Sequence, residues 1–314
     1  MLGFLLRRLA LSVPLFLLVS LLTFVTVAFI PGDPAVRILG AGHTLAEYHA
    51  FDVKIGLTEP VLVQYWHWLD RLLHGSLGSS LFTYQSVAAQ LDQRLPVTLS
   101  LVLGATLVSL VLGTSLGVAA ALWRGPIARL IDVVTWAGFA VPNFWLGLVL
   151  VELFAVRAHL LPASGYVSFS QSPGDWARSL VLPVLTLAAA GTTGIAKQTR
   201  NAMTEAMSRE YVTALRLAGV RRPAIVFRHA LRNAALTIVT VAGLFFVAML
   251  GGTILVENVF VLPGLGGLAV QAATDHDLPV IEGVVVYFTL IVIAVNILID
   301  LSYAWLNPRV RVSS

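Results

Sequence analysis

The ionisable and nucleophilic residues of this 314-residue chain form no pattern that is typical of a catalytic or metal site. The seven histidines show no His-Glu-x-x-His pairing, and the absence of cysteine excludes thiol catalysis, disulfides and cysteine-ligated metals. Neither of the two lysines, Lys54 and Lys197, follows a glycine, so a Gly-Lys phosphate-binding loop is impossible. Any ATP must therefore be hydrolysed by another polypeptide. We expect this chain to be no enzyme and to hold no catalytic residue, metal or cofactor.

Two carboxylates fall inside strongly apolar stretches, where an ion-coupled secondary transporter would need a proton relay. Glu152 lies late in one stretch with Arg157 close in sequence, and Asp300 lies late in the last stretch. We interpret each as a carboxylate near the membrane interface that is satisfied locally. The ion-coupled secondary transporter of small solutes is kept as the alternative function.

The composition places the chain in a membrane. Hydrophobic residues make up 58% and charged residues 11%, with a mean hydropathy of +0.87, whereas soluble domains carry about a quarter charged residues. A helix needs about 20 apolar residues to cross a bilayer. We predict an all-α integral membrane protein with six spans, near residues 9–31, 97–122, 131–156, 180–197, 234–256 and 281–305.

The basic residues predict the orientation. With the N-terminus inside, 14 of the 20 Lys and Arg residues lie on the cytoplasmic side, which satisfies the positive-inside rule and places both termini in the cytoplasm. The charge is therefore distributed as in a membrane protein, and we expect no nucleic-acid partner. The first apolar run, Leu9 to Ile30, is longer than the core of a signal peptide, so we interpret it as a retained anchor.

Two segments lie outside the predicted spans. Residues 32–95 have mixed charge, aromatic residues and glycines, and we expect a small extracytoplasmic helical cap between the first two spans. Residues 198–233 form an inner loop with the highest density of basic charge in the chain. We predict one region at 1–95, the first span plus cap, and a five-helix core at 96–314 that carries the inner loop.

Small residues follow one stripe of the second predicted span. They recur every four residues, which lets another helix approach closely, and they are Ala105, Ser109, Gly113, Gly117 and Ala121. We interpret the stripe as helix packing, within the chain or against a second subunit. In the third span, Asn143 and Phe144 follow Pro142 and are candidates for lining a pathway. A structural role, in which the asparagine satisfies a carbonyl freed by proline, is the interpretation that we favour.

The inner loop has the periodicity of a short amphipathic helix. Its apolar face follows i, i+3, i+4 spacing, through Met203, Ala206, Met207, Tyr211, Ala214, Leu215 and Ala218. Gly219 stands where a C-terminal cap glycine is expected, and Pro223 at the start of a second short helix. The spacing alone fits either an interfacial helix on anionic lipid or a docking element for a cytoplasmic partner.

The stretch "EYVTALRLAGVRRPAIVFRHALRNA", residues 210–234, resembles the cytoplasmic coupling loop of ABC-importer permeases. That loop reads Glu-Ala-Ala, three residues, Gly, then a nine-residue spacer and Ile-x-Leu-Pro. The triplet falls here on Thr213, Ala214 and Leu215, the glycine on Gly219 and the later leucine on Leu231. The departures, at Thr213, Leu215, His229 and Arg232, are those that the peptide-permease branch tends to show.

Further stretches resemble the same branch over nearly the whole chain. They are "FIPGDPA" at 29–35, "GLTEPVLVQYWHWL" at 56–69, "GSLGSSL" at 75–81, "RLPVTLSL" at 94–101, "LLPASGY" at 160–166, "VLPVLTL" at 181–187, "LVENVFVLPGLGGL" at 255–268 and "NPRVR" at 307–311. The chain thus resembles the B-type permease subunit of dipeptide and oligopeptide ABC importers.

The resemblance implies a type I ABC-importer permease in the bacterial inner membrane, forming half of a translocation pathway. Expected partners are a second homologous permease, two ATP-binding subunits that carry ATP and magnesium, an extracytoplasmic substrate-binding protein and the lipid bilayer. The residues implied to dock the ATPase are Tyr211, Thr213, Ala214, Arg216 and Gly219. Arg216 would pair with an ATPase carboxylate or, alternatively, a lipid headgroup. The substrate stays open among dipeptides, longer peptides, haem, nickel complexes and glutathione.

Overall fold

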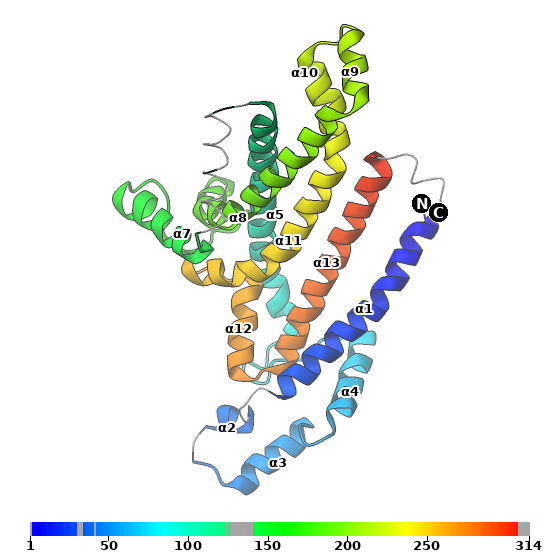
Figure 1. The fold of residues 1–314 in the computed structure, drawn as a ribbon. Helices are drawn as coiled ribbons and strands as arrows, with labels where there is room; N and C mark the ends of the chain where they lie inside the picture. Colours follow the sequence, from blue (N-terminus) through cyan, green and yellow to red (C-terminus); the bar gives the residue numbers. More distant parts are fainter. Residues whose placement is uncertain are drawn as a thin grey trace. The chain divides into compact units, whose positions relative to one another are not determined.

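The computed structural model describes residues 2–29, 34–40, 42–123, 125, 133 and 141–306, and these are mostly helical (Figure 1). In this part of the chain, the β-type pairing consists of an isolated bridge between Ser79 and Ser86. The all-α prediction is confirmed. Most of the first half of the predicted third span lies outside the described residues; its second half forms α7, Asn143–Leu150, and the π-helix η1, Val151–Arg157.

Five of the described helices are long and apolar enough to cross a membrane. They are α1 (Leu2–Ala28), α5 (Val87–Leu122), α8 (Pro173–Ser208), α11 (Leu231–Val259) with the preceding α10 and η2, and α13 (Leu278–Leu306). All five begin before the corresponding predicted spans. α5 starts at Val87 because its first turns carry buried apolar side chains of their own, and α8 starts after Ser172, whose hydroxyl accepts from the Asp175 amide at 3.3 Å.

The chain divides into two compact units, residues 1–96 with 263–294, and residues 97–262 with 295–314. The first boundary lies close to the predicted one at residue 95. Residues 263–294, which the sequence analysis assigned to the core, group here with the N-terminal unit. No periodicity in the sequence indicates that grouping, because it depends on contacts between distant segments. The division of the chain into two functional regions stays a prediction.

In the first unit, three short helices follow α1: α2 (Pro34–Leu39), α3 (Leu45–Ile55) and α4 (Val61–Leu73). They confirm the helical segment expected between the first two spans. α3 begins with a capping box, in which the Thr44 amide donates to the Glu47 carboxylate at 2.7 Å and the Glu47 amide donates to the Thr44 hydroxyl at 3.3 Å. α4 packs on α1 through Phe24, Tyr65 and Trp68, whose rings lie 5.7–6.3 Å apart.

The rest of the first unit joins α12, Leu265–Asp275, to the start of α5 and α13 around an apolar core. Val87 and Leu91 of α5 are fully buried in that core. A side chain at Gly283 of α13 would collide with Val87, so the glycine allows α13 to approach α5 closely. The Tyr287 hydroxyl donates to the Asp92 carboxylate at 2.6 Å and links the same two helices.

In the second unit, the predicted small-residue stripe of α5 lies against α8. The Ser109 hydroxyl donates to the Ala188 carbonyl at 2.9 Å. A Cβ added to Gly117 would lie 2.5 Å from the Ala196 carbonyl oxygen, and one added to Gly113 would lie 2.8 Å from Ile195. The stripe therefore packs a helix of the same chain, one of the two partners that the sequence left open.

Candidate functional site: the loop between α8 and α11

The basic inner loop contains a separate short helix, α9, Glu210–Leu217. α8 ends at Ser208, and Arg209 has an extended backbone with ψ 148° between the two helices. The single helical face predicted from Met203 to Ala218 is therefore wrong: the periodicity runs across a break. Met203 and Ala206 of α8 are buried, whereas Ala214 and Ala218 beyond the break are exposed.

The end of α9 confirms the predicted cap glycine. Gly219 has a φ of +76°, in the left-handed region. Its amide donates to the Arg216 carbonyl at 3.0 Å, and the Val220 amide donates to the Leu215 carbonyl at 3.0 Å. These two hydrogen bonds form a Schellman motif, which satisfies the last carbonyls of the helix and turns the chain sharply.

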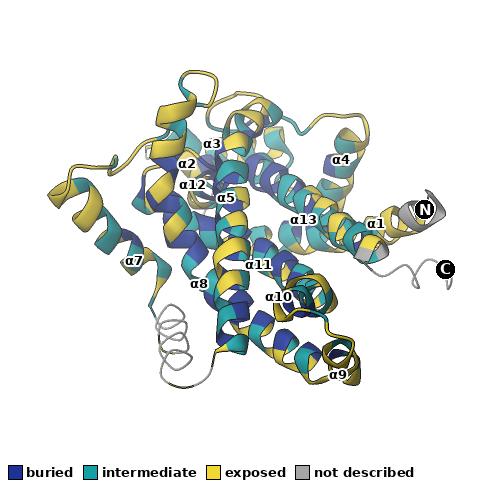
Figure 2. Ribbon diagram, turned by 90° about the horizontal axis from the view of Figure 1, so that it is seen from above, coloured by how far each residue is buried: buried dark blue, intermediate teal, exposed yellow. Residues whose placement is uncertain are grey.

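One side of α9 is anchored and the other is exposed. Val212 is buried, and the Asn233 amide nitrogen of α11 donates to the Tyr211 hydroxyl at 3.0 Å. The predicted docking residues Thr213, Ala214, Arg216 and Gly219 all lie exposed on α9 and its cap. Leu217 beside them is 85% exposed. Figure 2 shows α9 largely in the colour of exposed residues. Tyr211 thus holds the helix in place, while the other four form an accessible surface.

The second helix of the loop begins at Arg222, with Pro223 in its first turn as expected, and it is not a separate short helix. α10 (Arg222–Ala224) continues through the π-helix η2 (Ile225–Ala230) into α11, so that residues 222–259 form one helical stretch. Ile225 is buried, whereas Phe227 is 62% exposed. The prediction of a separate short helix is wrong, because no glycine or proline occurs between Pro223 and Gly243 to end the helix.

A hollow of about 490 Å³ lies between α9 and α10. Arg216 and Arg222 line it together with Met207, Gly219 and Ile225, and no carboxylate belongs to its lining. The nearby carboxylate of Glu205 is already engaged, since it accepts from Arg209 at 2.7 Å. The hollow is thus a cationic, partly apolar recess, which suits an acidic or amphipathic partner.

The other sequence candidates lie on different elements. Asn143 and Phe144 open α7 directly after Pro142, the residue that precedes the helix, and Phe144 is exposed. Neither residue belongs to the inner loop between α8 and α11. Glu152 accepts from the Arg157 Nε at 2.9 Å with both side chains exposed, which confirms the local partner expected for it. Asp300 is buried in α13.

Three acidic residues that the sequence did not indicate as buried lie in the interior of the protein. Glu257, Asp277 and Glu282 are all buried. Glu257 accepts from the Thr98 hydroxyl at 2.8 Å, within the second unit. Glu257 stands next to Asn258 and Asp277 next to His276, so the neighbouring residues in the sequence do not indicate the burial of these carboxylates.

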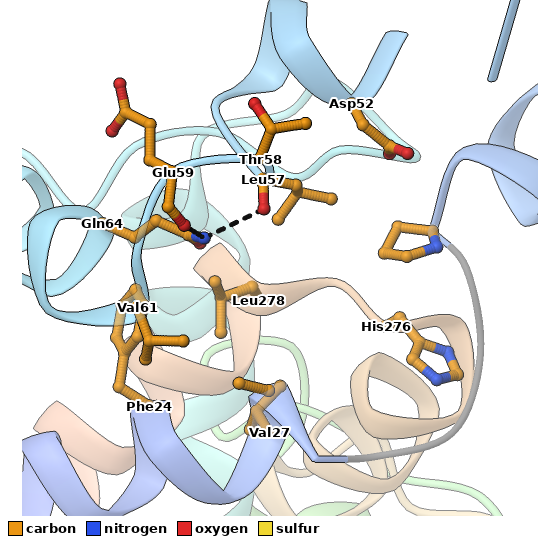
Figure 3. Close-up of a pocket in the computed structure, with 12 residues that line it drawn as sticks. Phe24, Val27, Asp52, Leu57, Thr58, Glu59, Val61, Gln64, His276 and Leu278 are labelled. Carbon is orange, nitrogen blue, oxygen red and sulfur yellow. Dashed lines mark hydrogen bonds between the residues drawn. The ribbon is translucent and has the colours of Figure 1, made fainter. Parts of the chain in front are cut away.

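The first unit holds a cavity of about 470 Å³ that no sequence pattern indicated (Figure 3). Apolar residues such as Phe24 and Val27 line it with the carboxyl-bearing residues Asp52 and Glu59. The Gln64 amide donates to the Leu57 carbonyl at 3.1 Å and the Glu59 carbonyl at 2.7 Å, and so fixes the loop between α3 and α4. The volume of the cavity falls in the range of about 300–1,000 Å³ that is typical of small-molecule sites.

Comparisons with known proteins agree with this architecture. The family described as "Binding-protein-dependent transport system inner membrane component" matches residues 112–312, and the N-terminal family of the same transport systems matches residues 1–102. A putative peptide transport system permease of Brucella abortus is 38% identical over 312 residues, which is 99% of both chains. The glutathione transport system permease GsiC of Salmonella typhimurium is 35% identical over 99% of both.

Further similarities extend to another genus and to solved structures. The oligopeptide transport system permease AppB of Bacillus subtilis is 32% identical over 99% of this chain and 100% of AppB. A chain of the inward-facing MetNI methionine ABC transporter aligns with a TM-score of 0.56 at 18% identity, over 70% of this chain and 97% of that one, which shows a shared fold. The chain belongs to the family of binding-protein-dependent transport system inner membrane components, the permease subunits of ABC transporters.

Proposed function

We propose that this chain is the permease subunit of an ATP-driven importer of peptides and forms half of its translocation pathway. The observation that carries the proposal is α9, a short capped helix that exposes Thr213, Ala214 and Arg216 next to a cationic recess. Relatives along the full length that are named for peptide and glutathione transport support the substrate class.

The loop between α8 and α11 can transmit a displacement of α9 to the membrane-spanning helix α11. Tyr211 hydrogen-bonds to Asn233 at the start of α11, so a displacement of α9 pulls on that helix directly. The uninterrupted helix at 222–259 carries the same displacement into the membrane, because a helix transmits motion as a rigid rod. The Schellman cap at Gly219 fixes the angle between the two parts. We infer that nucleotide-driven closure of an ATPase moves α9 and thereby opens and closes the pathway.

This function requires several partner subunits. Two ATP-binding subunits carry ATP and magnesium and dock on Tyr211, Thr213, Ala214, Arg216 and Gly219; a second, homologous permease completes the pathway. An extracytoplasmic binding protein delivers the peptide. Both termini and the basic loop lie in the cytoplasm. The ion-coupled alternative is not favoured, since the full-length relatives are named as peptide and glutathione transport system permeases, and Glu152 is an exposed carboxylate paired with Arg157.

Single cysteines test the docking and the orientation together. The chain has no cysteine, so Thr213→Cys and Pro60→Cys, both at exposed positions, can be labelled without background. We expect an impermeant maleimide to reach position 60 from outside intact cells, and position 213 only after permeabilisation. Position 213 should also cross-link to a single-cysteine ATPase subunit, with position 60 as the negative control. Labelling of position 213 from outside, or no cross-link in the intact complex, would refute the proposal.

A further inference from the structure

A second pocket in the first unit, of about 190 Å³, is lined mostly by polar residues. It lies between the first turns of α5, the loop 80–85 and the end of α12. Its ionisable and amide side chains include Arg94, Gln93, Gln271, Asp275 and Asp277. Small-molecule sites begin at about 300 Å³, so this pocket accommodates one end of a ligand and not a whole one.

The wall that carries Asp277 is rigidly built. The Asp277 carboxylate accepts from the Ser80 hydroxyl at 2.5 Å and from the Leu81 amide at 3.2 Å. The Ser80 oxygen in turn accepts from the amides of Phe82 at 3.2 Å and Thr83 at 3.0 Å. A loop held at four points does not have to be ordered when a ligand arrives, which lowers the entropic cost of binding.

The charges of the pocket leave its arginine without a counterion. Asp277 is committed to the loop 80–85, and its burial raises the pKa of the carboxyl group above the ordinary value. Asp275 pairs with Arg37, with 3.4 Å between Nη1 and Oδ1. Among the residues that the structure describes, Arg94 has neither a hydrogen-bond acceptor nor an ion-pair partner, although it is half-buried. The pocket therefore presents a free guanidinium group.

Two amide side chains accompany this arginine. Gln93 precedes it on α5 and Gln271 comes from α12, and in the described part of the chain neither side chain has a hydrogen-bond partner. A guanidinium group binds a carboxylate through two parallel N–H···O bonds, and neighbouring amides add further donors. A phosphate would suit the guanidinium group too, but the nearby Asp275 disfavours a doubly charged anion.

We propose that this pocket binds the terminal carboxylate of a short peptide, with Arg94 as its partner. The inference rests on the proposed peptide-import function and deepens it, since it assigns to the permease its own contact with the carboxyl end of the substrate. The pocket belongs to the first unit, which also contains the helical cap expected on the extracytoplasmic side, from which a binding protein would deliver peptide.

The experiment compares a dipeptide with its C-terminal amide in the complete complex, with ATPases and binding protein in proteoliposomes. The affinity of the binding protein for each ligand is measured separately and divided out. Charge-assisted hydrogen bonds of this kind correspond to about 10- to 100-fold in affinity. Arg94→Gln should raise KM for the dipeptide by about that factor with little change in kcat, and leave the amide unchanged. Arg94→Lys should recover part of the loss.

The ratio of acid to amide uptake does not depend on how much complex assembles, so poor assembly cannot imitate the effect. Arg178→Gln, at an exposed arginine of α8 outside the pocket, is the matched control and should keep the wild-type ratio. An unchanged ratio in Arg94→Gln, or equal losses for both ligands, overturns the inference. A wild-type complex without ATP-dependent peptide uptake overturns instead the proposed function.

Discussion

Replacing Gly219 separates the geometry of the α9 cap from its surface chemistry. The glycine has a φ of +76°, and a Cβ placed there would meet no atom within 4 Å. Gly219→Ala therefore causes no collision, and its whole cost is that of a left-handed backbone, about 1–2 kcal/mol for an L-residue. That cost lowers the population of the capped loop about 5- to 30-fold relative to its alternatives. Gly219→Val, with a β-branched side chain, should cost more.

The assay is ATP hydrolysis stimulated by loaded binding protein, together with uptake, in the assembled complex at equal expression. We expect Gly219→Ala to insert normally and to lose most of both activities. Gly219→Asn is the matched control, because asparagine tolerates the left-handed region and should keep most of the activity. Wild-type activity in Gly219→Ala would refute the role of the cap, as would an equal loss in Gly219→Asn, which would point to the side chain instead of the backbone.

Two further predictions concern stability. Gly117→Ala should lower the thermal midpoint of the purified subunit, because its Cβ would lie 2.5 Å from the Ala196 carbonyl oxygen. Gly251→Ala is the control and should leave the midpoint unchanged, since the space around its Cβ is open. Equal midpoints for the two variants would contradict the close packing at Gly117. Burial raises the pKa of Asp277, so the native state retains this proton above the unfolded pKa of about 3.9, and stability falls as pH rises through the higher native value. Asp277→Asn should flatten the dependence of the thermal midpoint on pH above about 4, and an unchanged slope would show that another group is responsible.

Local signals in the sequence were sufficient to predict where α9 ends and where α10 begins. Gly219 as a cap and Pro223 as a helix start follow from rules that act over a few residues, and both predictions are confirmed. The break at Arg209 was not predictable in the same way. The apolar spacing continues across it, and Arg209 has no special backbone preference, so the packing of α9 through Val212 and Tyr211 decides where the helix is interrupted.

The features that could not be predicted from the sequence depend on contacts between distant segments of the chain. The small residues of α5 indicated a close helix neighbour, but only the fold identifies α8 as that neighbour. The burial of Asp277 depends on Ser80, almost two hundred residues earlier in the chain. The polar pocket at Arg94 combines α5 with α12 in the same manner. One-dimensional patterns do not encode such pairings, so the cap of the candidate docking helix was predictable, whereas the break at which that helix begins and the pockets were not.

The most direct test of the account is peptide uptake into proteoliposomes under defined energy sources. With the second permease, the ATP-binding subunits, the binding protein and ATP all present, we expect uptake that stops when any one of them is omitted. This chain alone should take up no peptide under a proton or sodium gradient. Gradient-driven uptake by the isolated chain without ATP would contradict the central claim and indicate a secondary transporter.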